Sequence, residues 1–177
     1  RDVVLEYSGI DINEACDEKK LGAAIQAKKI TLDTTGVVGF GALLDTLYKA
    51  TARPQLVGPM FLTDRPTAFV TLAKRRPDDP SKTASFQLLI AGKEVINAYN
   101  ELNDPVDQAI RWRLSEKLGK EGQNEHEAFD DDYIRALEYG MPPTCGWGMG
   151  IDRLVSILTD QSSLKEVILF PTLRPEK

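Results

Sequence analysis

The sequence predicts a mixed α/β fold, an antiparallel sheet with helices packed mainly on one face. Two strand signals carry this prediction, at residues 86–101 and 143–150, and a long helix at 105–118 lies between them. A parallel sheet would instead show short strands alternating regularly with helices. The chain has 177 residues, 42% of them hydrophobic and 28% charged, which is enough for one domain with a core of its own.

The N-terminal segments predict one strand and two helices. Residues 3–7 look like a short strand closed by Ser8 and Gly9, and residues 17–29 have a helical composition. Residues 34–36, Thr-Thr-Gly, are able to cap a second helix. The apolar stripe of that helix belongs to the core and consists of Phe40, Leu43, Leu44, Leu47 and Tyr48.

The middle of the chain predicts further strands and two helices. Residues 59–63 and 68–73 are strand candidates, and residues 75–82, with two prolines, form a loop. Asp104 and Pro105 open the long helix as N-cap and first residue. A shorter helix at 130–139 stops at a glycine.

Residues 86–101 predict a hairpin that carries polar side chains. A two-residue turn at Gly92 and Lys93 places Gln87 and Glu94 on one face. The implied pairs are Ala91 with Glu94, Leu89 with Ile96, and Gln87 with Ala98. Asn97, Tyr99 and Glu101 form a row on the second strand. Strict alternation points this row away from Glu94, so a shared pocket requires a β-bulge near residues 95–96.

Residues 143–153 read Pro-Thr-Cys-Gly-Trp-Gly-Met-Gly-Ile-Asp-Arg and predict a strand with one bare face. Gly146, Gly148 and Gly150 alternate, so a ligand can lie directly on the backbone. A helix follows, with Arg153 in its first turn, where a guanidinium can bind phosphate or stack on a base. Its expected buried face is Ile151, Leu154, Val155 and Leu158. The alternative is that the glycines pack under a neighbouring element.

Composition excludes several classes of function. The net charge of -5 argues against binding nucleic acid mainly through overall charge, and the basic residues 74–76 are interpreted as a solvated loop. Cys16 and Cys145 form no metal or disulfide pattern, and the single histidine, His126, lies in a polar stretch. No apolar run reaches the ~20 residues of a membrane span and no signal peptide is visible, so we expect a cytoplasmic protein.

Two blocks of this sequence resemble the class II aminoacyl-tRNA synthetases, and the lysyl-tRNA synthetases in particular. The glycine-rich block with the Leu-Thr-Asp and Glu-Val-Ile-Leu-Phe-Pro that follow it is similar to their motif 3, and residues 91–105 agree as well. The aspartyl and asparaginyl enzymes resemble it less, because they typically have Glu-Arg where this chain has Asp152-Arg153. The resemblance implies an incomplete class II catalytic fold. Residues 1–177 would be the C-terminal portion of that domain, without motif 1, motif 2 or an anticodon-binding domain.

The resemblance also implies a role for each residue of a lysine site. Asn97 would contact the lysine carboxylate, Tyr99 would pack on the aliphatic stem, and Glu101 would pair with the ε-ammonium. Judged without the resemblance, Glu101 is a surface carboxylate and Tyr99 a half-buried core aromatic.

The resemblance to the class II synthetases also implies an ATP site. Glu94 would hold Mg²⁺, together with Gln87 at a position that is typically acidic in the family. Gly146, Gly148 and Gly150 would form the floor under adenosine, and Arg153 would hold the γ-phosphate.

The implied activity is activation of lysine by ATP and transfer to tRNA(Lys), in a homodimeric enzyme that needs Mg²⁺. We expect residues 1–177 alone to be inactive, and to expose apolar surface and an unpaired strand edge. Two alternatives stay open: a paralogue that lysylates an acceptor other than tRNA, such as a protein lysine, and a binding fragment without activity.

Overall fold

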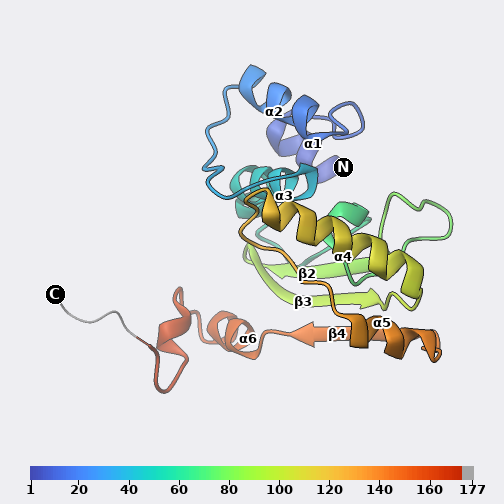
Figure 1. Ribbon diagram of the computed structural model, residues 1–177. Helices are drawn as coiled ribbons and strands as arrows, with labels where there is room; N and C mark the ends of the chain where they lie inside the picture. Colours follow the sequence, from blue (N-terminus) through green and yellow to red (C-terminus); the bar gives the residue numbers. More distant parts are fainter. Residues whose placement is uncertain (173–177) are drawn as a thin grey trace.

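The protein is built on a four-stranded antiparallel sheet with the strand order β1-β2-β3-β4 (Figure 1). Its strands are β1 (Met60–Thr63), β2 (Ser85–Ile90), β3 (Lys93–Asn100) and β4 (Cys145–Met149). The computed structural model describes residues 1–172, so residues 173–177, the end of the family resemblance, lie outside the described residues. The predicted antiparallel sheet is confirmed.

The helices agree with most of the sequence prediction. They are α1 (Asp2–Ser8), α2 (Glu18–Ala27), α3 (Phe40–Thr51), α4 (Pro105–Lys120), α5 (Asp131–Glu138) and α6 (Ile151–Leu158). Short 3-10 turns lie at Arg53–Gln55, Thr67–Phe69 and Leu164–Glu166. The predicted N-cap of α4 is confirmed, since the Asp104 side chain accepts hydrogen bonds from two backbone N–H groups of the first turn. No helix in residues 1–172 is long and apolar enough to cross a membrane.

The hydrophobic core lies between α1–α3 and one face of the sheet. Leu44 and Leu47 of α3 are fully buried there, together with Leu89 of β2. Met60 and Leu62 of β1 pack against the same cluster. On the other face Phe61 and Trp147 remain exposed, at 64% and 65% of their surface. The helices therefore cover mainly one face, as predicted.

Two predicted strands are wrong. Residues 3–7 belong to α1, which buries Val4 in the core, and Gly9 ends this helix in the left-handed conformation (φ 68°). Ser8 and Gly9 thus mark a helix C-terminus, a position at which glycine is favoured. Residues 68–73 do not form a regular strand, because a 3-10 turn occupies Thr67–Phe69 and only Ala73 forms a bridge, to Glu101 of the sheet.

The start of α3 also differs from the prediction. Residues 34–36 form a separate turn, in which Val37 N–H donates to Thr34 O. The residue that precedes the helix is Gly39 (φ 90°), and no side chain caps it. The apolar stripe predicted for this helix does enter the core.

The hairpin turn lies one residue earlier than predicted. Ala91 and Gly92 have positive φ angles of 51° and 67°, so these two residues form the turn and Ile90 pairs with Lys93. Two positive φ angles are typical of the type I′ turn, which matches the twist of a hairpin. Leu89 consequently lies opposite Glu94, and Gln87 lies opposite Asn97, which corrects the three predicted pairs.

The predicted β-bulge is present. Leu89 pairs with Glu94, but the next residue, Leu88, pairs with Ile96, so Val95 is the extra residue in β3. Because one inserted residue shifts the alternation of the strand, Glu94 shares a face with Asn97 and Tyr99.

An ion-pair cluster joins α4 to the segment that precedes β2. Arg111 is 6% exposed and donates to Ala73 O at 2.7 Å and to Val70 O at 3.1 Å. Asp107 accepts from Arg111 at 2.6 Å and from Arg75 at 3.0 Å. Burial by itself raises the pKa of Asp107, but the hydrogen bonds from Arg111 and Arg75 outweigh it, so the pKa lies below its usual value.

Replacing Asp107 by Asn should lower the free energy of unfolding by about 3 kcal/mol at neutral pH, because Arg111 would be left buried without its carboxylate. The stabilisation by Asp107 is fully present above its unfolded pKa of ~3.9 and is lost as the pH falls through the lower folded pKa. Denaturant unfolding between pH 7 and pH 2 measures both effects. Asp132→Asn, which breaks an exposed pair with Arg135, is the control and should change little. Equal stability of both variants would contradict this role of Asp107.

Candidate functional site

The glycines of β4 and the polar row of β3 lie on the same face of the sheet. Gly148 pairs with Asn97 and Gly146 pairs with Tyr99, and directly paired residues point to one side. Gln87 of β2 is the partner of Asn97 across the other ladder. The structure therefore brings together the predicted lysine residues, the predicted metal residues and the bare strand on one surface.

Gln87 and Glu94 are in direct contact. Gln87 Nε2 donates to Glu94 Oε2 at 2.7 Å, which leaves one oxygen of each side chain for another partner. Within residues 1–172 no group of three or more acidic, histidine or cysteine side chains gathers as a metal site. One carboxylate with an amide oxygen suits a single Mg²⁺, which commonly takes its remaining ligands from phosphates and water. The donors present thus fit one cation held by Glu94.

A cavity of about 160 Å³ opens beside the polar row. Asn97 and Tyr99 line it from β3, and Arg65, Glu127 and residues 69–72 line it from the surrounding segments. Glu127 is fixed in place, since its Oε2 accepts from Thr71 Oγ1 at 2.5 Å and from Trp112 Nε1 at 3.0 Å. Burial raises the pKa of Tyr99, and the charges of Glu101 and Glu127 raise it further. Tyr99 therefore lies between two carboxylates.

The Glu101 carboxylate lies over Gly146. A Cβ added at Gly146 would overlap Glu101 Oε1, so glycine at this position lets the Glu101 side chain keep its place. Burial raises the pKa of Glu101, and among the ion pairs of the described residues none involves this carboxylate. Burial also raises the pKa of Tyr133 of α5, with a contribution from the charge of Glu101, so α5 closes this end of the row. Glu101 is thus a partly desolvated carboxylate that no cation of residues 1–172 neutralises.

Gly148 provides the bare surface that the sequence predicts. Nothing lies within 4 Å of a Cβ built on it, whereas Gly150 lies under the Arg153 side chain. Arg153 folds over Gly150 and donates from Nη1 to Glu94 O at 2.8 Å. The guanidinium therefore stands beside Glu94 at the edge of the surface and leaves Gly148 uncovered.

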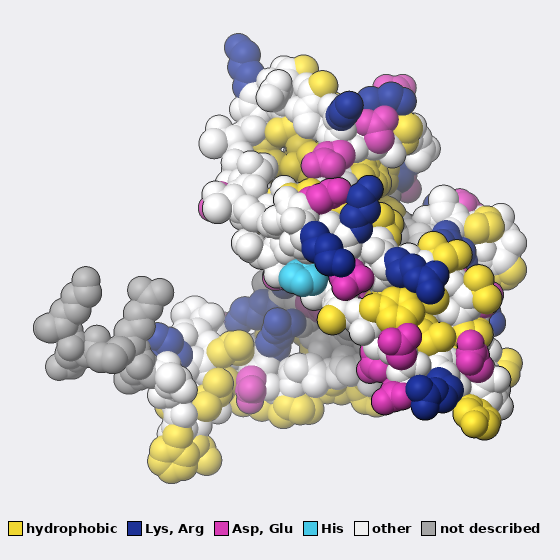
Figure 2. All heavy atoms as spheres, in the orientation of Figure 1, with side chains coloured by type: hydrophobic (Ala, Val, Ile, Leu, Met, Phe, Trp, Pro, Cys, Tyr) yellow, Lys and Arg dark blue, Asp and Glu magenta, His cyan; other side chains and the backbone are white. Residues whose placement is uncertain are grey.

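Helix α6 does not bury the face that its sequence predicts. Ile151 and Leu158 are exposed at 61% and 75%, and Ser156 is the residue of this helix that is buried. Figure 1 shows α6 projecting from the sheet beyond β4, and Figure 2 shows hydrophobic side chains along this margin of the molecule. The apolar pattern of α6 has little of the described chain to pack against, which explains the difference.

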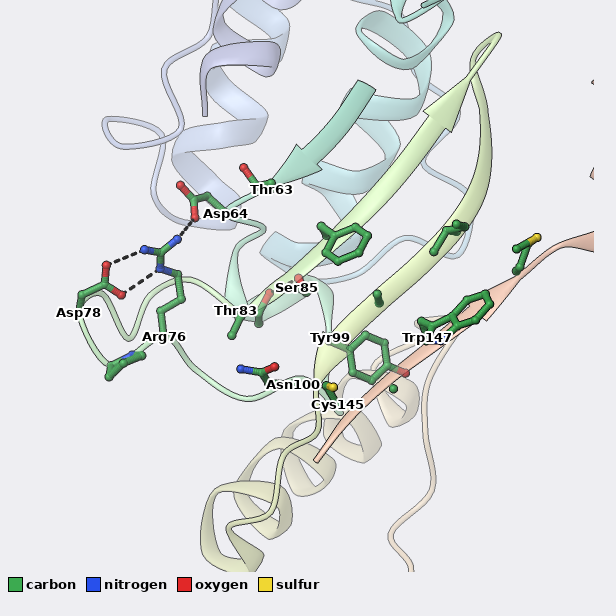
Figure 3. Close-up of a pocket in the computed structure, with 17 residues that line it drawn as sticks. Thr63, Asp64, Arg76, Asp78, Thr83, Ser85, Tyr99, Asn100, Cys145 and Trp147 are labelled. Atoms are coloured by element: carbon green, nitrogen blue, oxygen red, sulfur yellow. Dashed lines mark hydrogen bonds and ion pairs between the residues drawn. The ribbon is translucent and has the colours of Figure 1, made fainter. Parts of the chain in front are cut away.

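A larger hollow, of about 810 Å³, lies on the opposite face of the sheet. Phe86, Ala98 and Trp147 line it, and Figure 3 shows Arg76 paired with Asp64 and Asp78 at one end and Trp147 at the other. The lining is mostly apolar, and neither Glu94 nor Glu101 contributes to it. We therefore assign the functional site to the smaller cavity and the glycine surface, where the unpaired polar groups converge.

Comparison with known proteins identifies the family of the chain. Residues 8–174 match the family model of tRNA synthetases class II (D, K and N). The chain belongs to this family. It is 42% identical over 176 residues to a lysine–tRNA ligase of Christiangramia forsetii, 45% over 177 residues to one of Dehalococcoides mccartyi, and 42% over 176 residues to one of Porphyromonas gingivalis. These matches cover 98–99% of the chain but only 30–35% of each relative, so the class II chain spans about a third of their length.

The sequence analysis did not identify Arg65, Thr71, Glu127 and Tyr133 as neighbours of the polar row. Glu127 belongs to the polar stretch around His126, which carries no periodic pattern, and Arg65 lies in the loop two residues after the short strand β1. Only the tertiary fold brings them to β3. Tyr133 is the one residue of these four that lay in a correctly predicted element, because it belongs to the first turn of the helix predicted at 130–139.

Gly148→Val should abolish nucleotide binding and keep the fold, because its side chain would fill the open surface without touching another residue. Equilibrium binding of ATP and the near-ultraviolet circular dichroism spectrum measure the two properties. Gly58→Val is a matched control, since Gly58 also has nothing within 4 Å but lies outside the site. Unchanged ATP affinity of Gly148→Val would show that the glycines do not form a nucleotide floor.

Proposed function

We propose that this chain supplies part of the active site of a lysine–tRNA ligase, which activates lysine with ATP and transfers it to tRNA(Lys). The observation that carries the proposal is the row of Asn97, Tyr99 and Glu101 beside the bare Gly148, all on one face of the sheet. The names of the relatives and the family match support it. A homodimeric enzyme with Mg²⁺ as cofactor belongs to the same proposal.

The row suits an amino acid with a cationic side chain. Asn97 and Glu101 are about 13 Å apart along β3, with Tyr99 between them. Glu101 offers a half-buried carboxylate without a cation, and Glu127 adds a second carboxylate near Tyr99. An aliphatic stem packs on the Tyr99 ring, while the ammonium group at its end is held by the carboxylates. Asn97 is left for the carboxylate end of the substrate.

The neighbouring surface suits ATP. Adenosine lies on Gly148, and the phosphates extend toward Glu94 and Arg153, which adjoin each other on β3 and α6. Mg²⁺ held by Glu94 supplies charge neutralisation for the phosphate oxygens when it is bound. Attack of the lysine carboxylate on the α-phosphorus forms lysyl-adenylate and releases pyrophosphate. Such a step depends on positioning and electrostatic stabilisation and requires no protein nucleophile.

Lysine-dependent exchange of pyrophosphate into ATP, measured on the whole protein, tests the proposal. Charging of tRNA(Lys) with labelled lysine then identifies the acceptor. Exchange without tRNA charging would favour lysylation of another acceptor, such as a protein lysine. Absence of exchange, together with absence of lysine binding, would overturn the proposed function.

Glu101→Gln should weaken lysine binding far more than ATP binding. The substitution removes the carboxylate that we assign to the ε-ammonium, and the loss of one partner of such a pair costs about 2–5 kcal/mol. Isothermal titration of the whole protein with each ligand measures the two affinities. Glu138→Gln, at the exposed end of α5, is the control. A similar loss for lysine and ATP, or none for lysine, would contradict the assignment.

Residues 1–177 alone should not form lysyl-adenylate at an appreciable rate. Glu94 and Arg153 are placed for the outer phosphates, and we expect the donor for the α-phosphate in motif 2, which these residues do not include. One missing donor toward a developing negative charge typically costs ~100–1,000-fold in rate. Pyrophosphate exchange by the isolated chain, compared with the whole protein, is the measurement. Exchange within about tenfold of the whole protein would show that the roles are assigned wrongly.

A further inference from the structure

Arg65 is an arginine without an acidic partner at the wall of the small cavity. It lies two residues after the end of β1, is half-buried, and reaches β3, where Nη1 donates to Asn97 Oδ1 at 3.3 Å. Its Nε is buried and has no hydrogen-bond partner. Of the five N–H groups of the guanidinium, a single one thus has a partner in the described chain.

The ion pairs of neighbouring segments provide a contrast. Arg75, Arg76 and Arg111 each pair with at least one aspartate at 3.0 Å or less. No carboxylate of residues 1–172 lies within the 4.0 Å of an ion pair to Arg65, although the charges of Glu94 and Asp45 act on it from farther away. Burial lowers the pKa of Arg65. Retaining a guanidinium there destabilises the unliganded protein, because a buried charge without a partner is costly.

Asn97 is oriented by this contact. Its Oδ1 accepts from Arg65, so its Nδ2 is left as a second donor beside the same cavity. Donors that converge with one positive charge are the arrangement that binds a carboxylate or a phosphate.

We propose that Arg65, which the sequence analysis gave no role, joins Asn97 in a binding subsite for an anionic group of the substrate, either the carboxylate of the amino acid or a phosphate oxygen of the nucleotide. The inference rests on the proposed function for the identity of these substrates. The cavity wall then carries the positive Arg65 and the negative Glu127, and Glu101 adds a second negative charge near Tyr99 outside the wall. An amino acid with a cationic side chain has the same distribution of charge, which aligns it in one direction.

The test compares the wild-type whole protein with Arg65→Met, Arg65→Lys and the control Arg135→Met, which removes an exposed arginine of α5. The ligands are L-lysine, L-lysinamide, ATP and inorganic pyrophosphate, with affinities from isothermal titration. Arg65→Met should weaken one anionic ligand by about 10- to 100-fold, as expected for a lost hydrogen bond to a charged group. Loss for L-lysine but not L-lysinamide identifies the carboxylate as the anion, and loss for ATP and pyrophosphate identifies the phosphate. Arg65→Lys should recover part of the affinity.

Thermal unfolding separates this role from a structural one. Without ligand, Arg65→Met should melt at or above the temperature of the wild type, because the substitution removes an unpaired buried charge. A lower melting temperature with equal weakening of all four ligands would overturn the proposal, and so would unchanged affinity for all of them. If the wild type binds neither lysine nor ATP, the proposed function fails. In that case pyrophosphate alone tests the anion subsite. A rise in the melting temperature of the wild type with pyrophosphate that is lost in Arg65→Met supports the subsite, and the absence of any rise overturns it.

Discussion

The extra residue in β3 is the constraint on which the site depends. Val95 is inserted between the pairs Leu89–Glu94 and Leu88–Ile96, and without it Glu94 would point to the opposite face from Asn97. The bulge also places the start of α6, since Val95 O accepts from Gly150 N–H at 2.9 Å and Glu94 O accepts from Arg153. One backbone irregularity therefore sets the positions of the Glu94 carboxylate, the polar row and the Arg153 guanidinium relative to each other.

Glycine at two positions of β4 serves two different purposes. At Gly146 the absent side chain makes room for the Glu101 carboxylate, so this glycine has a packing role within the chain. At Gly148 no part of the described chain uses the space. The two alternatives for the motif, packing and ligand binding, therefore do not apply to all its glycines alike: packing accounts for Gly146, and ligand binding stays a prediction for Gly148.

Much of the fold and of the site could be predicted because local chemistry determines it. The Asp104-Pro105 cap, the apolar stripe of α3 and the alternating glycines each act within a few residues. The prediction of a strand at residues 3–7 was wrong because a short apolar run fits a strand or a buried helix turn equally well, and only packing against α3 decides. The hairpin register was displaced by one residue because Ala91 takes a positive φ, which alanine rarely adopts. The neighbours from distant segments, Arg65 and Glu127, have no local signal.

The candidate site contains charged side chains that have no partner of opposite charge in the described residues, unlike the ion pairs that stabilise the fold. The Asp107 cluster is fully paired and joins α4 to the sheet, whereas Arg65 and Glu101 stand partly desolvated without counter-charges. Charges of this kind lower stability unless a ligand completes them, so they are expected at functional positions rather than in a structural core. Arg65 contacts Asn97 from the segment that follows β1, and Glu101 lies just beyond the end of β3 near Tyr99, so the two unpaired groups of opposite sign stand at different ends of the polar row. Under the proposed function, an amino acid with a cationic side chain would satisfy both charges together, which would tie the specificity of the pocket to the charges that the unliganded fold leaves unpaired.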